Sequence, residues 1–229
     1  MIISALESAF GTDLGLSGAE GFLKAPYFRL FCHGPSDKQY NFSDNGDGDM
    51  GAPMMWFFAD KLKDNSLLYY ETLPGGNSSQ ANALLLEAFG VLDPVYIIYA
   101  DRFGGNAAPQ PSSRVFAGRG IQPLVIARTG WGVEDLYLGL KGGNPTNGHA
   151  HMDCGSFVFD AYGYRWAADL SKGEYTHYES NFDSTRDLWK KTADSPRWRL
   201  FAYNNRQHNT ITINDKDHSV PGYAPLLDV

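Results

Sequence analysis

Two histidines and an aspartate alternate in the stretch Gly-His-Ala-His-Met-Asp, which covers residues 148–153. Alternate side chains of a β-strand share a face, so His149, His151 and Asp153 would point the same way at the start of a strand. Buried polar groups each need a partner, which makes three of them on one face hard to explain by packing. The pattern predicts a site that binds metal or moves protons, with His208 as a further member.

Two carboxylates compete for a place in a metal site with His151 and His208. Zinc accepts histidine nitrogen and carboxylate oxygen in tetrahedral geometry. With Asp153 the set resembles the facial triad of non-haem iron oxygenases. With Asp169, at the end of a predicted hairpin, His149 is left over for proton transfer. Spacing does not choose between these sets, and a third interpretation is that some of the histidines only satisfy buried carbonyls.

The elements that must position these residues change character near residue 108. Before it, the apolar spacing is typical of helices, and after the Pro-, Ala- and Ser-rich residues 106–113 the pattern is typical of short strands. Helices are expected at Ile2–Phe10, Gly18–Cys32, Pro53–Lys63, Ser66–Leu73 and Ser79–Phe89. Strands are expected at Pro123–Trp131, Asp135–Lys141, Ser156–Tyr162, Tyr164–Asp169, Trp198–Asn204 and Thr210–Asn214.

This division predicts a helical domain over residues 1–108 and an antiparallel β-domain over residues 109–229. An antiparallel sheet usually needs more strands than these to close a core, so the chain is expected to be a fragment. The acidic loop Tyr40–Asp49 lies in the helical half. It lacks the glutamate that ends an EF-hand loop, because Met55 stands there, and an acidic turn is the favoured interpretation.

Composition excludes several classes of protein. The chain has 229 residues, of which 43% are hydrophobic, and a net charge of -7. A nucleic-acid-binding protein is not expected, because no basic stripe is present. No apolar run is long enough for a membrane span, and no signal peptide is visible. Cys32 and Cys154 are too few for a disulfide framework, and no base is evident that would make Cys154 a nucleophile.

Four blocks of sequence carry a family resemblance. They are Asn147–Asp169, Asp187-Leu-Trp189, Ser195-Pro-Arg-Trp198 and Asn204–Asn214. Together they resemble the heparinase II/III-like polysaccharide lyases, closely over residues 140–220 and more loosely over residues 1–108. The resemblance implies an α+β multidomain fold: the end of an incomplete (α/α) toroid followed by an antiparallel β-sandwich, incomplete at its C-terminus, with substrate in the cleft between the two domains.

The resemblance also implies roles for individual residues. By position, His151, Asp169 and His208 match the family's ligands to a structural Zn²⁺, and His149 matches its active-site histidine. Asp153 then supports the metal site by fixing the tautomer of a ligand or the loop. Candidate contacts to a uronic-acid polysaccharide are Tyr175, Tyr178, Arg186, Arg197 and Arg206, where arginine can grip a carboxylate or sulfate. We assign Trp166, Trp189 and Trp198 to the core.

The implied reaction is β-elimination on uronic-acid glycans of the heparan, heparin or alginate type. In the family, a catalytic tyrosine comes from an earlier toroid helix, so this chain by itself is expected to be weak or inactive. The family's usual location implies export to the periplasm or the exterior. Two alternatives stay open: a cupin-like or non-haem iron oxygenase that uses His151, Asp153 and His208, and a non-catalytic carbohydrate-binding β-module.

Overall fold

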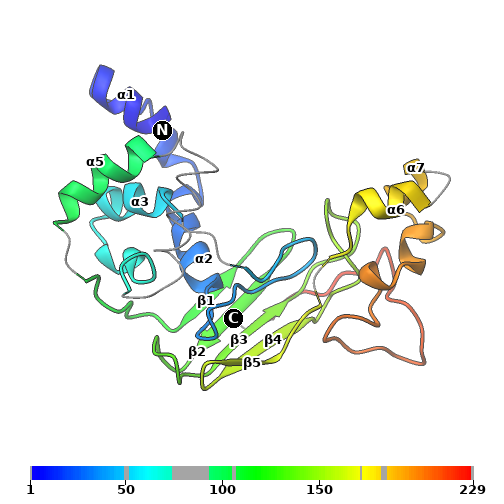
Figure 1. Cartoon of the computed structure of the whole chain (residues 1–229). Helices are drawn as coiled ribbons and strands as arrows, with labels where there is room; N and C mark the ends of the chain where they lie inside the picture. The colour runs from blue at the N-terminus through cyan, green and yellow to red at the C-terminus, as the bar shows by residue number, and fades with distance from the viewer. Residues whose placement is uncertain are drawn as a thin grey trace. The chain divides into compact units, whose positions relative to one another are not determined.

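The computed structural model describes residues 2–48, 52–73, 93–104, 107–170, 172–181 and 185–227 (Figure 1). The chain forms two compact units. The first combines Met1–His33 with Asp49–Ser113, and the second combines Gly34–Gly48 with Arg114–Val229. The segment Gly34–Gly48 therefore packs with the strands that follow it by some seventy residues, although it lies in the half expected to be helical.

The first unit is helical. Its helices are α1 (Ile2–Phe10), α2 (Ala25–Cys32), α3 (Met54–Leu62) and α5 (Asp93–Phe103), with 3-10 turns η1 (Leu16–Gly18), η2 (Phe22–Lys24) and η3 (Asn65–Leu68). Helix α3 lies in the core of this unit, because its five consecutive residues from Met55 to Ala59 are buried. Phe57 packs edge-on against Tyr99 of α5, with ring centroids 5.8 Å apart. Within the described residues, no helix is both long and apolar enough to span a bilayer.

The expected helices are confirmed in part. Ile2–Phe10 is α1, and Pro53–Lys63 contains α3. The single helix expected over Gly18–Cys32 is wrong, because Gly21 adopts a left-handed φ of 80° and α2 starts only at Ala25. The helix expected at Ser66–Leu73 is shortened to η3, and α5 was not foreseen. The helix expected at Ser79–Phe89 lies outside the described residues.

The second unit contains a five-stranded antiparallel sheet with the strand order β1-β2-β3-β4-β5 (Figure 1). The strands are β1 (Val115–Gly118), β2 (Leu124–Arg128), β3 (Tyr137–Lys141), β4 (Phe157–Ala161) and β5 (Tyr164–Ala167). Each strand follows its neighbour directly, so the sheet is a simple meander. The β4–β5 hairpin turns at Tyr162 and Gly163, whose φ values of 53° and 77° are those of a two-residue I′ turn.

The two faces of this sheet differ in what covers them. On one face Ile126, Tyr137 and Val158 are fully buried. The Tyr40 ring packs against this face at Gly139. A Cβ atom added to Gly139 would lie 2.8 Å from the Tyr40 ring, so only glycine fits at this position. On the other face Leu138 and Phe157 stay 40% and 37% exposed. Among the described residues the strands form this one sheet, and the second layer of a β-sandwich stays a prediction.

The C-terminal part of the second unit differs from the expected strands. Pro196–Arg199 and Phe201–Tyr203 form the 3-10 turns η4 and η5, so the strand expected at Trp198–Asn204 is wrong. The Ser195 side chain accepts a hydrogen bond from the Arg197 amide, and Pro196 supplies a fixed helical φ, which starts a helical turn. The strand expected at Thr210–Asn214 is also absent, since these described residues pair with no strand. Two short helices were not foreseen, α6 (Tyr175–Asn181) and α7 (Thr185–Leu188).

Candidate active site

The segment with the two alternating histidines is a loop and not the start of a strand. Strand β4 begins only at Phe157, and His149 has a left-handed φ of 59°. This backbone turn separates the side chains that alternation would place on one face. The His149 side chain is 72% exposed, whereas those of His151 and Asp153 are fully buried. The expected shared strand face is therefore wrong, while the clustering of polar groups remains.

Asp44 connects the two histidines. Its Oδ2 lies 2.7 Å from His149 Nδ1, and its Oδ1 lies 2.9 Å from His151 Nε2. The Tyr175 hydroxyl donates a third hydrogen bond to Oδ2. Sequence reasoning missed this residue, because Asp44 precedes His149 by 105 positions. The acidic loop that contains it was noticed, but as a turn.

The electrostatics of the cluster favour an ionised Asp44. Burial raises the pKa of its carboxyl, but hydrogen bonds from His151, Tyr175 and His149 outweigh this and hold the pKa well below its usual range. Burial lowers the pKa of His151, although Asp44 opposes this. Burial and the hydrogen bond to Asp44 raise the pKa of Tyr175. The arrangement is thus one carboxylate that accepts from three donors.

His151 and His208 form a second pair deeper in the unit. Their ring centroids are 5.2 Å apart, and Asp169 Oδ2 lies 2.8 Å from His208 Nδ1. Among the described residues, His151 Nδ1 and His208 Nε2 are buried and have no hydrogen-bond partner. Each ring therefore has one nitrogen next to a carboxylate and the other open to a ligand, as is typical of metal-binding histidines.

The structure brings together the three residues expected to bind zinc, but not as three ligands around one point. Asp169 Oδ2 accepts from His208 and from Ser156 Oγ at 2.9 Å. Within the described part of the chain, no group of three or more His, Cys, Asp or Glu side chains is arranged to hold a metal ion. His151 Nδ1 and His208 Nε2 are nitrogens of the type that bind metal ions, and Asp169 lies against the ring of His208.

Asp153 lies beside this pair and is fully engaged. Its Oδ1 is 2.6 Å from Lys141 Nζ, and its Oδ2 accepts from both the amide and the hydroxyl of Ser43, each at 2.9 Å. Lys141 and Asp153 are both completely buried. Although burial raises the pKa of the Asp153 carboxyl, the Lys141 ammonium keeps it below its usual value. Asp153 thus ties the segment Gly34–Gly48 to the loop that carries the histidines.

The expected substrate contacts separate into two groups. Tyr175 stacks on Trp189 at 4.6 Å and on Tyr203 at 5.8 Å, and Tyr178 packs against Tyr203 as well. Arg197 is completely buried, with its guanidinium 3.9 Å above the Tyr203 ring and a hydrogen bond of 3.1 Å to the Ala150 carbonyl. Arg197 thus supports the histidine loop from inside the unit.

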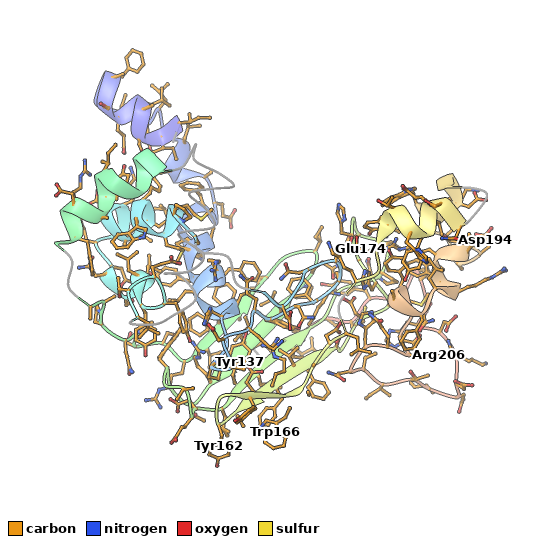
Figure 2. All side chains as sticks on the ribbon, in the orientation of Figure 1. Tyr137, Tyr162, Trp166, Glu174, Asp194 and Arg206 are labelled. Atoms are coloured by element: carbon orange, nitrogen blue, oxygen red, sulfur yellow. The ribbon has the colours of Figure 1, made fainter. Side chains whose placement is uncertain are left out.

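The other expected arginines do not join the cluster. Arg206 is exposed and pairs with Asp217 and Asp215 (Figure 2). The side chain of Arg186 lies outside the described residues. Of the tryptophans assigned to the core, only Trp198 is there, at 3% exposure. The assignment is wrong for Trp166 and Trp189, which are 69% and 44% exposed.

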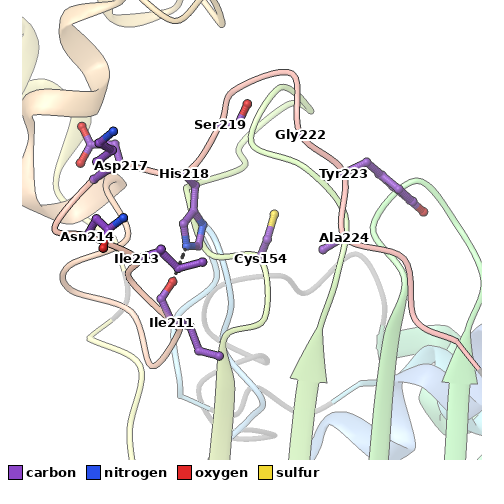
Figure 3. A pocket seen from close by; sticks show the side chains of 11 residues that line it. Cys154, Ile211, Ile213, Asn214, Asp217, His218, Ser219, Gly222, Tyr223 and Ala224 are labelled. Carbon is purple, nitrogen blue, oxygen red and sulfur yellow. Dashed lines mark hydrogen bonds between the residues drawn. The ribbon is translucent and has the colours of Figure 1, made fainter.

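A separate pocket lies away from this cluster, between the C-terminal segment and the loop before β4 (Figure 3). It has a volume of about 450 Å³, and Cys154, Ile211, Ile213, His218 and Tyr223 are among its lining residues. Burial raises the pKa of the Cys154 thiol, and its Sγ donates to the Gly143 carbonyl at 3.1 Å. These features favour an inert thiol, as expected from the sequence.

A comparison with known protein families agrees with the resemblance over part of the chain. Residues 123–225 match the family described as Heparinase II/III-like, C-terminal. No curated protein matches the chain. A similar solved structure is that of a heparan sulfate lyase HepC mutant from Pedobacter heparinus, with 15% sequence identity and a TM-score of 0.46. The alignment covers 78% of this chain and 24% of the HepC chain, so this chain spans about a quarter of that protein's length.

Proposed function

Because residues 123–225 match the heparinase II/III-like C-terminal family, we propose that the full-length protein is a polysaccharide lyase. Its substrates are uronic-acid glycans of the heparan, heparin or alginate type, cleaved by β-elimination. One observation carries the proposal beyond the family match. His149 is exposed, its Nδ1 is held by Asp44, and its Nε2 has no partner among the described residues. This is the arrangement that a proton-transferring histidine needs.

In the proposed reaction, His149 Nε2 takes the proton from C5 of the uronic acid. The C–H electron pair forms the C4–C5 double bond, and the bond between C4 and the glycosidic oxygen breaks. That oxygen leaves with the electron pair and receives a proton from a general acid. The products are an unsaturated uronate at one new chain end and a free hydroxyl group at the other.

The exposed aromatic surface beside His149 suits a sugar. Tyr175 lies next to His149, with ring centroids 6.5 Å apart, and Trp189 stacks on Tyr175. Aromatic rings give large contact areas to the apolar faces of ligands. We propose that Trp189 and Tyr175 contribute to substrate binding, whereas buried Arg197 and acid-paired Arg206 do not grip the glycan.

We also propose a structural zinc site beside the histidine loop. His151 Nδ1 and His208 Nε2 would hold the ion, supported by Asp44 and Asp169 on the opposite ring nitrogens. A bound zinc ion would fix the position of the loop that carries His149. Asp153 is already occupied by Lys141 and Ser43, which argues against an oxygenase triad. Export to the periplasm or the exterior is proposed from the family resemblance alone.

The test of the lyase activity uses the full-length protein, heparan sulfate and alginate. The unsaturated uronate absorbs in the ultraviolet, so elimination appears as a rise in absorbance. His149→Ala should abolish this rise. The matched control is His177→Ala, because His177 is an exposed histidine on α6 whose hydrogen bonds within the described part of the chain are both with Asn181. Oligosaccharide binding without turnover would support the non-catalytic module instead.

A further inference from the structure

The segment that carries Asp44 is anchored through the neighbouring residue Ser43. Ser43, with a left-handed φ of 52°, donates its amide and its hydroxyl to Asp153. Asp153 is in turn paired with buried Lys141. The side chain of Asp44 is 13% exposed, so it lies mostly inside the unit. A carboxylate fixed in this way can impose its geometry on the groups that contact it.

We propose that Asp44 is a positioning residue that sets the tautomers of His149 and His151 together. This inference rests on the proposed lyase function and adds a residue to its site. An ionised carboxylate only accepts hydrogen bonds, so each ring nitrogen that contacts it must carry a proton. His149 then carries its proton on Nδ1, and His151 carries its proton on Nε2.

The two tautomers have opposite consequences that suit the two proposed roles. In a neutral imidazole with the proton on Nδ1, the lone pair is on Nε2, which leaves His149 Nε2 able to accept a proton from substrate. With the proton on Nε2, the lone pair of His151 is on Nδ1, the nitrogen that is buried without a partner. One carboxylate therefore directs one histidine toward proton transfer and the other toward ligand binding.

Tyr175 completes the arrangement. Its hydroxyl donates to the same Oδ2 that accepts from His149. The Tyr175 ring is held by stacking between Trp189 and Tyr203. A third donor restricts the rotation of the carboxylate, so that Oδ1 stays with His151 and Oδ2 stays with His149.

Asp44→Asn tests this inference because an amide of nearly the same shape has only one acceptor atom. Either His149 or His151 must then face an N–H₂ group, which cannot accept its proton. In the full-length protein with ¹⁵N-labelled histidine, the ring-nitrogen shifts of wild type should report His149 protonated on Nδ1. In Asp44→Asn at least one of the two histidines should change tautomer. Unchanged tautomers of both histidines would overturn the inference.

Kinetics give the second readout. If His149 loses its orientation, kcat on the uronic polymer should fall by about 10²-fold or more, the usual contribution of a general base, while KM changes little. Asp44→Glu, which keeps the carboxylate, should recover part of kcat and the wild-type tautomers. A kcat of Asp44→Asn equal to that of wild type, measured while the tautomer of His149 has changed, would overturn the inference.

The matched control is Asp47→Asn. It removes the same charge from the same loop, but Asp47 pairs with Lys38 and both side chains are 45% exposed. Asp47→Asn should keep wild-type tautomers and kcat. If wild type cleaves no uronic polymer, the proposed function fails, whereas the tautomer measurement still decides the role of Asp44.

Discussion

Replacing Asp153 with asparagine should destabilise the second unit strongly, because Asp153 is one half of a completely buried ion pair. Its Oδ1 lies 2.6 Å from Lys141 Nζ, and both side chains are 0% exposed. Removing one partner leaves a buried, uncompensated charge, which costs about 3–5 kcal/mol. The amide oxygen of asparagine can still accept from Ser43, so the loss comes mainly from the stranded Lys141 ammonium.

Urea unfolding, followed by circular dichroism, measures this effect. With an m value of about 2 kcal/mol/M, the midpoint for Asp153→Asn should fall by about 2 M relative to wild type. Asp47→Asn removes an exposed partner and should change the free energy of unfolding by about 1 kcal/mol at most. The double variant Lys141→Met with Asp153→Asn removes both charges and should be more stable than Asp153→Asn alone. A loss no larger than that of Asp47→Asn would show that the buried ion pair does not stabilise the unit.

Three further predictions concern pH, metal and thiol reactivity. The pKa of Asp153 is depressed on folding, so its stabilising contribution is complete above pH of about 4 and is lost as the pH falls through the folded value. Wild type should therefore lose more stability than Asp153→Asn between about pH 5 and pH 2 in urea titrations, and parallel losses would contradict this. Added Zn²⁺ should raise the melting temperature of wild type but not of His208→Ala, with a stabilisation of about 2.7 kcal/mol at 100 times Kd; equal shifts would argue against the metal site. Burial raises the pKa of the Cys32 thiol to about 12, so native Cys32 should resist iodoacetamide at pH 8 and react after denaturation, as mass spectrometry can check.

The sequence predicted the sheet better than the elements around it. Strands β2 to β5 are short and rich in aromatic and branched apolar residues, and turn residues such as Gly163 separate them. The segment around Trp198 has the same aromatic and apolar composition, but Pro196 and the Ser195 cap turn it into 3-10 helix. Composition alone does not distinguish these two outcomes, because local capping decides between them.

The histidines of the cluster were predicted from the sequence, but the carboxylate that connects two of them was not. His149, His151 and His208 were recognisable from residue type and spacing, and the structure places all three in one unit. Asp44 was not, because nothing in local sequence indicates that residues 34–48 pack beside a loop more than 100 positions later. The pairing of Ser43 with Asp153 is one of the contacts between this segment and the histidine loop, and such long-range contacts leave no periodic signal in the sequence.

Burial of single side chains was the least predictable property. Arg197 was expected to contact a uronic-acid polysaccharide, yet it is buried over the Tyr203 ring. Trp166 was expected inside and is 69% exposed at the sheet edge, where its indole donates to the Ala161 carbonyl (Figure 2). Both outcomes depend on neighbours from other parts of the chain, which residue type does not specify.

The proposed lyase function depends above all on the role of His149 as the proton-transferring residue. It is tested most directly by following the ultraviolet absorbance of unsaturated uronate while the full-length protein, His149→Ala and His177→Ala each meet heparan sulfate and alginate. We expect a rise on at least one polymer for wild type and His177→Ala, and no rise for His149→Ala. A flat trace for wild type on every uronic polymer, or an undiminished rise for His149→Ala, would contradict it.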